Sequence, residues 1–368
     1  MISETVHDKL GPEKIIEVYD SKSRMHGFVV IDNTALGPGK GGIRMTPSVN
    51  KEEVFRLARA MTYKCSLAEL PFGGAKSGII ANPKEISPEK KDELIRAFAK
   101  ALKPVSPSQY VAAPDMSVAE HEMKIYAETN GNKKSCTGKP RSMGGVPHEL
   151  GSTGLGVFHA AKVAAEHLGL DLKDLSFAVE GFGNVGWFAA KHLSEAGARL
   201  VAASDSKGVI HNPGGLRFEE LAKTKKEKGS VTKYKPGHVL KPEQITGLEA
   251  DMLITAAVPD LITIANKDKL KYRIIVEGSN IPMTPAIEEE LHTKGILIIP
   301  DFVANAGGVI SSYVEYKGGD DKEMFRLVKE KIVKNTRLVL EKSKKDNVSP
   351  RTAALEIAVA RIEKAMGE

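Results

Sequence analysis

The stretch from residue 176 to residue 197 constrains the fold most, because an apolar run leads directly into clustered glycines and then into a helical pattern. SFAVE (176–180) predicts a buried strand, and WFAAKHLSEAG (187–197) predicts a helix that begins just after the glycines. Further apolar runs alternate with helical patterns: ARLVAAS (198–204), DMLITAA (251–257), RIIVEGS (273–279) and GILIIPD (295–301). This alternation predicts a parallel sheet with helices on both faces.

The glycines between the first strand and its helix have the spacing G-x-G-x-x-G, at Gly181, Gly183 and Gly186. The first permits a tight turn, the second lets a pyrophosphate approach the backbone, and the third lets helix and strand pack closely. The helix N-terminus then offers free N–H groups to phosphate. We therefore predict a dinucleotide site here; a glycine turn that binds no nucleotide is the alternative.

The end of the next strand bears on the choice of dinucleotide. Asp205 could accept hydrogen bonds from the adenosine ribose and repel a 2′-phosphate, which favours NAD. Ser206 and Lys207 could instead hold that phosphate, which favours NADP. The sequence leaves NAD and NADP both open.

The rest of the chain predicts a second α/β region. HGFVVIDN (26–33) and YVAAPD (110–115) have strand patterns, residues 51–70 and 87–102 have helical ones, and the last forty or so residues are helical. A Gly-, Pro- and Ser-rich stretch at 132–152 marks a boundary. The predicted fold class is α/β with two domains separated by a cleft: an N-terminal α/β substrate domain and a Rossmann-type dinucleotide-binding domain. The predicted bounds are 1–140, completed by helices 335–368, and 141–334.

Composition narrows the class of protein. No apolar run approaches the roughly 20 residues that span a bilayer, and the N-terminus has no signal-peptide pattern. The two cysteines follow no metal-ligand spacing and fit a reducing cytoplasm, so we expect a cytoplasmic protein without a metal site. The net charge of +6 comes from 53 basic residues against 47 acidic ones. The dense basic stretch 223–235 is interpreted as solvated, and we expect neither nucleic acid nor a membrane as a partner.

Three lysines of the N-terminal region stand in unusual surroundings. Lys40 and Lys76 lie among glycines, in GPGKGGIRM and LPFGGAKSGII, and Lys64 shares a helix face with apolar residues. Solvated surface lysines are the alternative. Partly buried lysines would repel one another unless an anion joined them, and a dicarboxylate substrate would be such an anion. GGAKSG is not a phosphate-binding P-loop, because Ala75 and Leu70 stand where that motif needs glycine.

Together these segments resemble the amino-acid dehydrogenases that include glutamate, leucine, phenylalanine and valine dehydrogenases. The resemblance covers nearly the whole chain and rests on ordered motifs: GPGKGGIRM, MTYKCSLAELPFGGAKSGI, VAAPD, TGKP, STGLGVF, EGFGNVG, SDSKG, VEGSNIPMTP and IPDFVANAGGVISSYVE. It implies that Lys76 is a catalytic lysine of lowered pKa, which activates water against an iminium carbon. It also implies that Asp115 exchanges a proton with the substrate nitrogen and that Lys64 holds the substrate α-carboxylate.

The resemblance further implies a substrate and a cofactor. Lys40 and Ser312 match the glutamate pattern for the γ-carboxylate, and Val309 belongs to the same pocket. The expected cofactor-binding residues are those of the glycine turn and of the ribose and nicotinamide region: Thr153, Gly181, Gly183, Asn184, Val185, Gly186, Asp205, Ser206, Lys207, Asn280 and Asn305.

The expected reaction is NAD(P)-dependent conversion of L-glutamate to 2-oxoglutarate and ammonia, in a homo-oligomer such as a hexamer. Two alternatives stay open. One is a dehydrogenase of a branched-chain or other amino acid, and the other is a catalytically silent nucleotide-binding homologue.

Overall fold

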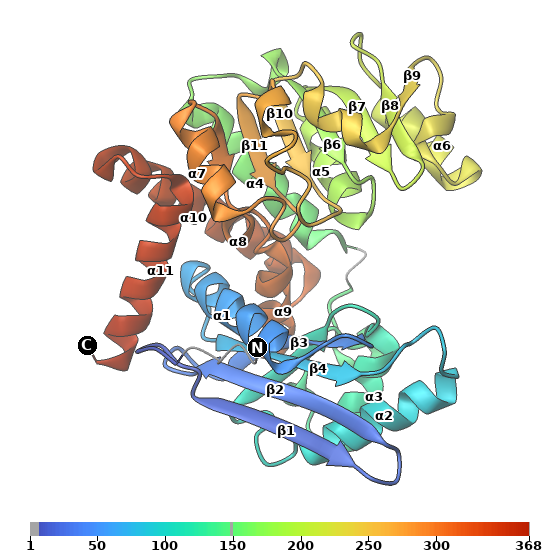
Figure 1. Cartoon of the computed structure of the whole chain (residues 1–368), viewed down its shortest axis with the longest axis vertical. Coiled ribbons are helices and arrows are strands. Elements are labelled where there is room, and N and C mark those ends of the chain that lie inside the picture. Colours follow the sequence, from blue (N-terminus) through green and yellow to red (C-terminus); the bar gives the residue numbers. More distant parts are fainter. Residues whose placement is uncertain (1–6, 148–149, 368) are drawn as a thin grey trace. The chain divides into compact units, whose positions relative to one another are not determined.

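A computed structural model describes residues 7–147 and 150–367 (Figure 1). The chain divides into two compact units. The first unit comprises residues 1–150, 309–324 and 356–368, and the second comprises residues 151–308 and 325–355. Residues 309–324 thus group with the N-terminal part, and residues 325–355 group with the second unit. The domain bounds given from the sequence stay a prediction.

A five-stranded mixed sheet forms the centre of the described part of the first unit. Its strands, in pairing order, are β1 (Lys14–Asp20), β2 (Met25–Asn33), β4 (Gly73–Ile80), β3 (Gly39–Thr46) and β5 (Tyr110–Pro114). The pairs β1–β2 and β2–β4 are antiparallel, whereas β3 runs parallel to both β4 and β5. The carboxyl ends of β3, β4 and β5 therefore lie at the same edge of the sheet.

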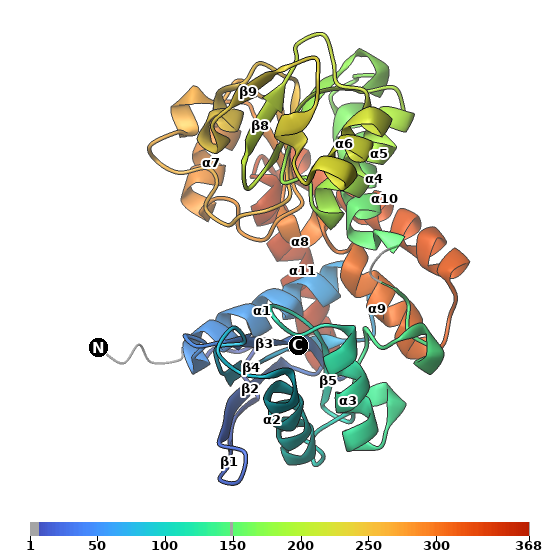
Figure 2. The same ribbon diagram turned by 90° about the vertical axis from the view of Figure 1, so that its right-hand side faces the viewer.

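Alternation along β2 explains how helices cover both faces of this sheet. Phe28 and Val30 pack in one core with residues of α1 (Lys51–Leu67), while Val29 and Ile31 pack in another core with residues of α2 (Pro88–Ala101) and α3 (Glu120–Asn130). Successive strand residues point to opposite faces, so a strand covered on both sides is apolar throughout. Figure 2 shows the sheet between these helices.

The glycines of β3 and β4 are required by the close approach of the chain to itself. A Cβ at Gly41 would lie 1.7 Å from the carbonyl oxygen of Ala75 in the neighbouring strand. A Cβ at Gly74 would lie 2.2 Å from the backbone nitrogen of Thr62 in α1. Glycine thus lets α1 lie directly on β4, two residues before Lys76.

The second unit contains, among its described residues, a seven-stranded sheet. In pairing order its strands are β12 (Leu297–Ile299), β11 (Ile274–Glu277), β10 (Met252–Thr255), β6 (Ser176–Glu180), β7 (Arg199–Asp205), β8 (Gly208–His211) and β9 (His238–Leu240). The strands from β12 to β7 are parallel, as the sequence predicted. The short strands β8 and β9 extend the sheet in antiparallel fashion.

Helices surround this second sheet. They are α4 (Ser152–His167), α5 (Asn184–Glu195), α6 (Phe218–Lys228), α7 (Pro285–Thr293) and α8 (Asp301–Ala304). Short 3₁₀ turns along the chain lie at Lys133–Ser135, Arg141–Met143, Leu172–Asp174, Val231–Lys233, Pro242–Gly247 and Lys267–Lys269. Within residues 7–147 and 150–367, no helix is both long and apolar enough to cross a membrane.

The C-terminal part is helical, as predicted: α9 (Gly307–Lys317), α10 (Asp321–Asp346) and α11 (Pro350–Met366). Each of these helices contains residues of both units. At the start of α11, Arg351 makes ion pairs with Glu277 and Asp301 of the second unit. Near its end, Arg361 donates to the carbonyl of Leu67 at 2.7 Å and so caps the C-terminus of α1 in the first unit.

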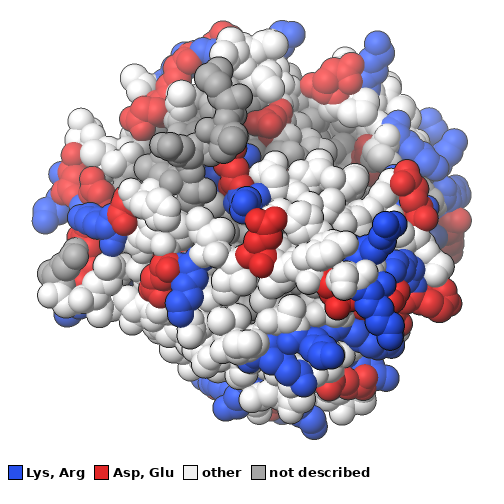
Figure 3. All heavy atoms as spheres, turned by 60° about the horizontal axis from the view of Figure 1, so that its bottom comes forward, with Lys and Arg blue, Asp and Glu red and all other residues white. Residues whose placement is uncertain are grey.

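Charges of both signs lie close together on the face shown in Figure 3, where lysine and arginine side chains have acidic neighbours in most places.

Candidate functional site

Lys76 lies on β4 and Asp115 directly follows β5, and these two strands lie on either side of β3. Ile43 of β3 pairs with Ser77 of β4, and Gly42 pairs with Ala113 of β5. A Cβ at Gly42 would lie 2.8 Å from the Cβ of Asp115, so glycine leaves room for the carboxylate. Lys76 Nζ and Asp115 Oδ2 form an ion pair across this position, with side chains 11% and 16% exposed. A proton can therefore pass directly between them.

Two further groups hold the Asp115 carboxylate. Its Oδ1 accepts a hydrogen bond of 2.7 Å from the N–H of Met116. Its Oδ2 lies 3.5 Å from Nε of Arg44, whose Nη1 is 2.6 Å from Glu53. Burial alone would raise the pKa of Asp115, but the charges of Lys76 and Arg44 outweigh burial and hold this pKa below its ordinary value.

Sequence reasoning missed Arg44, although a signal was present. Arg44 follows Lys40 and Gly42 at intervals of two along β3, so all three lie on one face of the strand. Alternation in GPGKGGIRM could therefore have placed Arg44 beside the other charged groups.

Lys40 is a fully buried cation near the start of β3, with only 1% of its surface exposed. Its Nζ donates to the carbonyl of Ala112 at 2.7 Å and lies 3.4 Å from that of Val111, both in β5. Burial lowers the pKa of Lys40 to about 7, although the nearby charge of Glu315 acts in the opposite direction. The first unit thus holds, on the sheet that carries Lys76, an ammonium group hydrogen-bonded to neutral carbonyls.

Lys64 lies in the last turn of α1 and is half-buried. It follows Thr62, whose backbone packs against Gly74 of β4. Local packing therefore brings this end of α1 against the strand that bears Lys76.

Helix α9 carries Ser312 and Val309 and is fixed to the first unit by its side chains. Tyr313 and Tyr316 pack edge-on against Phe72, at ring-centre distances of 6.1 and 5.0 Å. Because Phe72 directly precedes β4, this aromatic cluster ties α9 to the strand of Lys76. Ser312 is half-buried and Val309 is buried.

One turn beyond Ser312, Glu315 gathers the segment that contains TGKP. Its carboxylate accepts from the backbone N–H groups of Gly138 at 2.9 Å, Lys139 at 3.3 Å and Val146 at 3.1 Å. It also forms a buried ion pair with Nζ of Lys139, 2.5 Å away. Sequence reasoning missed this pair because its members are 176 residues apart.

The glycine turn has the local structure that a dinucleotide site needs. Gly181 has a φ of +90°, and a Cβ at Gly186 would lie 2.0 Å from the carbonyl oxygen of Gly181. A Cβ at Gly183 would meet open space, and α5 begins at Asn184 without a side-chain cap. The backbone N–H groups of its first turn, at Asn184, Val185 and Gly186, are therefore available to phosphate.

Two asparagines near this sheet leave buried oxygens unsatisfied: Asn184 and Asn305 each have an Oδ1 without a partner in the described structure. Nδ2 of Asn305 donates to Oδ1 of Asn280 at 2.9 Å, so the structure brings these two predicted residues together. Thr153 lies beside Gly308, three residues after Asn305: a Cβ at Gly308 would be 3.0 Å from Oγ1 of Thr153. Buried acceptors and a bare glycine turn fit a nicotinamide dinucleotide.

Asp205 ends β7, beside the glycine turn. The N–H of Phe182 donates to the carbonyl of Ser204 at 2.7 Å, and the N–H of Gly181 donates to the Ser204 hydroxyl at 3.0 Å. Ser206 and Lys207 follow Asp205 in an exposed turn.

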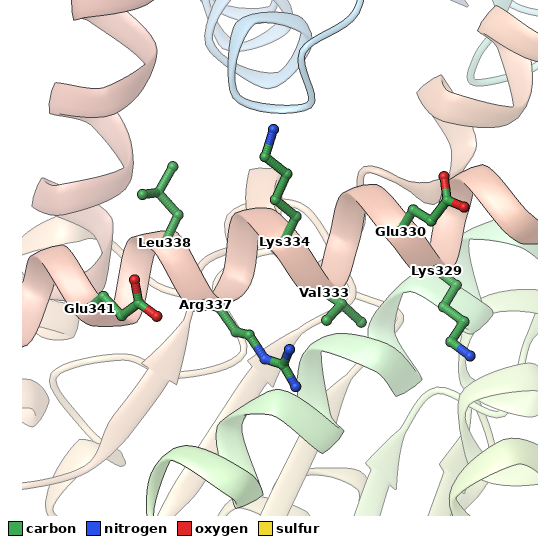
Figure 4. Close-up of a pocket in the computed structure, with 7 residues that line it drawn as sticks. All are labelled: Lys329, Glu330, Val333, Lys334, Arg337, Leu338 and Glu341. Carbon is green, nitrogen blue, oxygen red and sulfur yellow. The ribbon is translucent and has the colours of Figure 1, made fainter.

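A pocket of about 580 Å³ lies along α10, away from these residues. Figure 4 shows its lining side chains projecting from successive turns of the helix. Nη2 of Arg337 donates to the carboxylate of Glu166, in α4, at 3.0 Å. None of the lining residues is a predicted site residue: Lys329, Glu330, Val333, Lys334, Arg337, Leu338 and Glu341. Residues 7–147 and 150–367 contain no group of three His, Cys, Asp or Glu side chains that could hold a metal ion.

Two family models match this chain and together cover most of it. Residues 144–368 match the model of the Glutamate/Leucine/Phenylalanine/Valine dehydrogenase domain, and residues 12–131 match that of the Glu/Leu/Phe/Val dehydrogenase dimerisation domain. The chain belongs to this dehydrogenase family. It is therefore an amino-acid dehydrogenase, and the family resemblance and the two-domain α/β fold class are confirmed.

Individual members of the family are similar over most of their length. A glutamate dehydrogenase of Aeropyrum pernix is 41% identical over 351 residues, which cover 91% of this chain and 84% of the relative. An NADP-specific glutamate dehydrogenase of Saccharolobus shibatae is 35% identical, with coverages of 96% and 89%. The crystal structure of a hetero-hexameric glutamate dehydrogenase of Thermus thermophilus, in a Leu-bound form, superposes with a TM-score of 0.85 at 28% identity, covering 96% of this chain and 89% of that one.

Proposed function

We propose that this chain is an NAD(P)-dependent glutamate dehydrogenase that interconverts L-glutamate with 2-oxoglutarate and ammonia. Lys40 is the observation that carries the proposal. A buried ammonium in a pocket for an apolar side chain would have no counter-charge, which is costly. The second carboxylate of glutamate supplies that charge. The names of the Aeropyrum and Saccharolobus relatives support the same substrate.

In the proposed reaction, a nicotinamide cofactor held at the glycine turn would supply the acceptor for the hydride of the substrate Cα. Lys64 holds the α-carboxylate, and Asp115 takes the proton that leaves the substrate nitrogen. Lys76 takes a proton from the water that adds to the iminium carbon. Asp115 then returns its proton to the nitrogen, and the C–N bond breaks as the new hydroxyl gives up its proton to become the keto group, so that ammonia leaves. The direct contact of Lys76 with Asp115 supports this division of labour, because protons can be exchanged between them without a solvent step.

The remaining proposed roles follow the same pattern. Ser312 and Val309 contribute to the pocket for the far end of the substrate, supported by the attachment of α9 to Phe72. On the cofactor side, Gly181, Gly183 and Gly186 receive the pyrophosphate. Thr153, Asn280 and Asn305 are proposed to line the nicotinamide and its ribose.

Kinetics with Lys40→Leu test the substrate. Truncating one partner of a buried charge pair costs about 2 kcal/mol or more, which corresponds to a rise of roughly 30-fold or more in the glutamate KM. The apolar replacement should at the same time improve turnover of leucine. Lys103→Leu is the matched control, because Lys103 is an exposed lysine of the same unit.

Two outcomes would favour the other candidate functions. Faster turnover of leucine than of glutamate by the unaltered protein would indicate a branched-chain amino-acid dehydrogenase. Cofactor binding without turnover of any amino acid would indicate a silent homologue.

We also propose a homo-oligomer, with a hexamer as the specific form. The name of the matched dimerisation domain and the hetero-hexameric assembly of the Thermus relative support it.

A further inference from the structure

The carboxylate of Asp205 is fully occupied by groups of the protein itself. Its Oδ2 accepts from Nζ of Lys225 at 2.7 Å and from the N–H of Val231 at 2.9 Å. Its Oδ1 accepts from the N–H of Lys207 at 2.9 Å and from the Ser230 hydroxyl at 3.1 Å. An ionised carboxylate has about four acceptor sites, so four donors leave none for a ligand.

Burial and charge support the same view. The Asp205 side chain is only 7% exposed, and the ammonium of Lys225, which comes from α6, neutralises its charge. Burial would raise the pKa of Asp205, but Lys225 and the backbone N–H groups outweigh it and lower this pKa. The carboxylate is thus held ionised and paired.

The position of Asp205 at the end of β7 connects this pairing with cofactor binding. An acidic residue at the end of the second strand of a dinucleotide fold binds the ribose hydroxyls of NAD and repels the 2′-phosphate of NADP. Asp205 stands at that place, since the glycine turn hydrogen-bonds to Ser204, the residue before it. A carboxylate that is neutralised and fully hydrogen-bonded can do neither.

The two residues after Asp205 present what a phosphate needs. Ser206 offers a hydroxyl and Lys207 an ammonium group, and both lie exposed in the turn from β7 to β8. Phosphate is bound by such charge-assisted donors.

We infer that Lys225 sets the cofactor specificity of this chain: by pairing with Asp205 it removes the repulsion of the 2′-phosphate, so that NADP(H) binds more tightly than NAD(H). Lys225 is a positioning residue, which acts through Asp205 and does not itself touch the cofactor. The inference rests on the proposed function only in taking the glycine turn as the cofactor site, and it is independent of the amino-acid substrate.

Direct binding tests it without substrate. The dissociation constants of NADPH and NADH are measured by fluorescence titration for the unaltered protein, Lys225→Met, Lys225→Arg and Lys226→Met. We expect at least tenfold tighter binding of NADPH by the unaltered protein, and at least a tenfold loss of this preference in Lys225→Met, mostly through weaker NADPH binding. Lys225→Arg should retain the preference because the guanidinium also pairs with a carboxylate. Lys226→Met, which changes an exposed neighbour, should leave it unaltered.

A double variant separates charge from structure. If the exposed charge of Asp205 causes the effect, Asp205→Asn combined with Lys225→Met should restore the preference for NADPH. A merely structural role of Lys225 would weaken both cofactors equally and leave their ratio unchanged, which would overturn the inference, as would a preference of the unaltered protein for NADH. Turnover of leucine instead of glutamate would overturn the proposed substrate but not this ratio.

Discussion

Replacing Lys40 by methionine should stabilise the ligand-free protein, and by an amount that depends on pH. Lys40 has a pKa of about 7 in the folded chain against an ordinary value of 10.5. At 1.36 kcal/mol per pKa unit, keeping this ammonium charged in the folded state costs on the order of 5 kcal/mol. Methionine has a similar length, fills the same space and carries no charge.

The sign follows from proton binding. Below pH 7 the lysine is protonated in both states, so the folded protein bears the full cost and the variant has its greatest advantage. Between about pH 7 and 10.5 only the unfolded chain keeps the proton, so the stability of the unaltered protein rises with pH relative to the variant. Above that window the advantage of the variant should be lost.

Urea unfolding at pH 6 and pH 10, at one fixed protein concentration, measures this difference. Lys103→Met, at an exposed position, should show the same stability as the unaltered protein at both values. Adding 2-oxoglutarate at 100 times its dissociation constant should stabilise the unaltered protein by about 2.7 kcal/mol and the Lys40→Met variant far less. An advantage of the variant that is equal at pH 6 and pH 10 would refute the reasoning.

Two other substitutions probe the groups around the site. Arg44→Met removes one of the two cations beside Asp115, so the pKa of Asp115 should rise. The acid limb of the pH–rate profile should then move to higher pH. An unmoved limb would mean that Arg44 does not act on Asp115. Glu315→Gln leaves the ammonium of Lys139 buried without its counter-charge and should lower the free energy of unfolding by about 3 kcal/mol, measured by urea unfolding. Glu341→Gln, at a position outside the site, serves as its control, and equal losses in both variants would contradict the role given to the buried pair.

Features that depend on a few consecutive residues could be predicted from the sequence. Apolar runs that alternate with helical patterns predicted the parallel strands. The spacing of Gly181, Gly183 and Gly186 predicted the glycine turn. Both of these inferences need only a few consecutive residues. The family resemblance, and no local pattern, assigned Lys76 and Asp115 to one reaction, and the structure joins them in an ion pair.

The parts with a long-range cause were not predictable. Glu315 meets Lys139 over 176 residues, and Lys225 reaches Asp205 from a helix 20 residues further on. Strand β9 has three residues, too few to show alternation. No period in the sequence encodes such pairings. The sequence could therefore name NAD and NADP as the two possible cofactors, but it could not show that Asp205 is paired with Lys225.

The way in which the first unit is drawn from three separated segments has a consequence for synthesis. Its α1 meets the last segment through the Ser66 hydroxyl, which donates to the carbonyl of Ala358 at 2.7 Å. About 200 residues are translated between residue 150 and the start of that segment, which takes on the order of 10 to 40 s. During this interval the end of α1 lacks the contacts that Ala358 and Arg361 make with Ser66 and Leu67 in the folded chain, so the first unit is completed only late in synthesis.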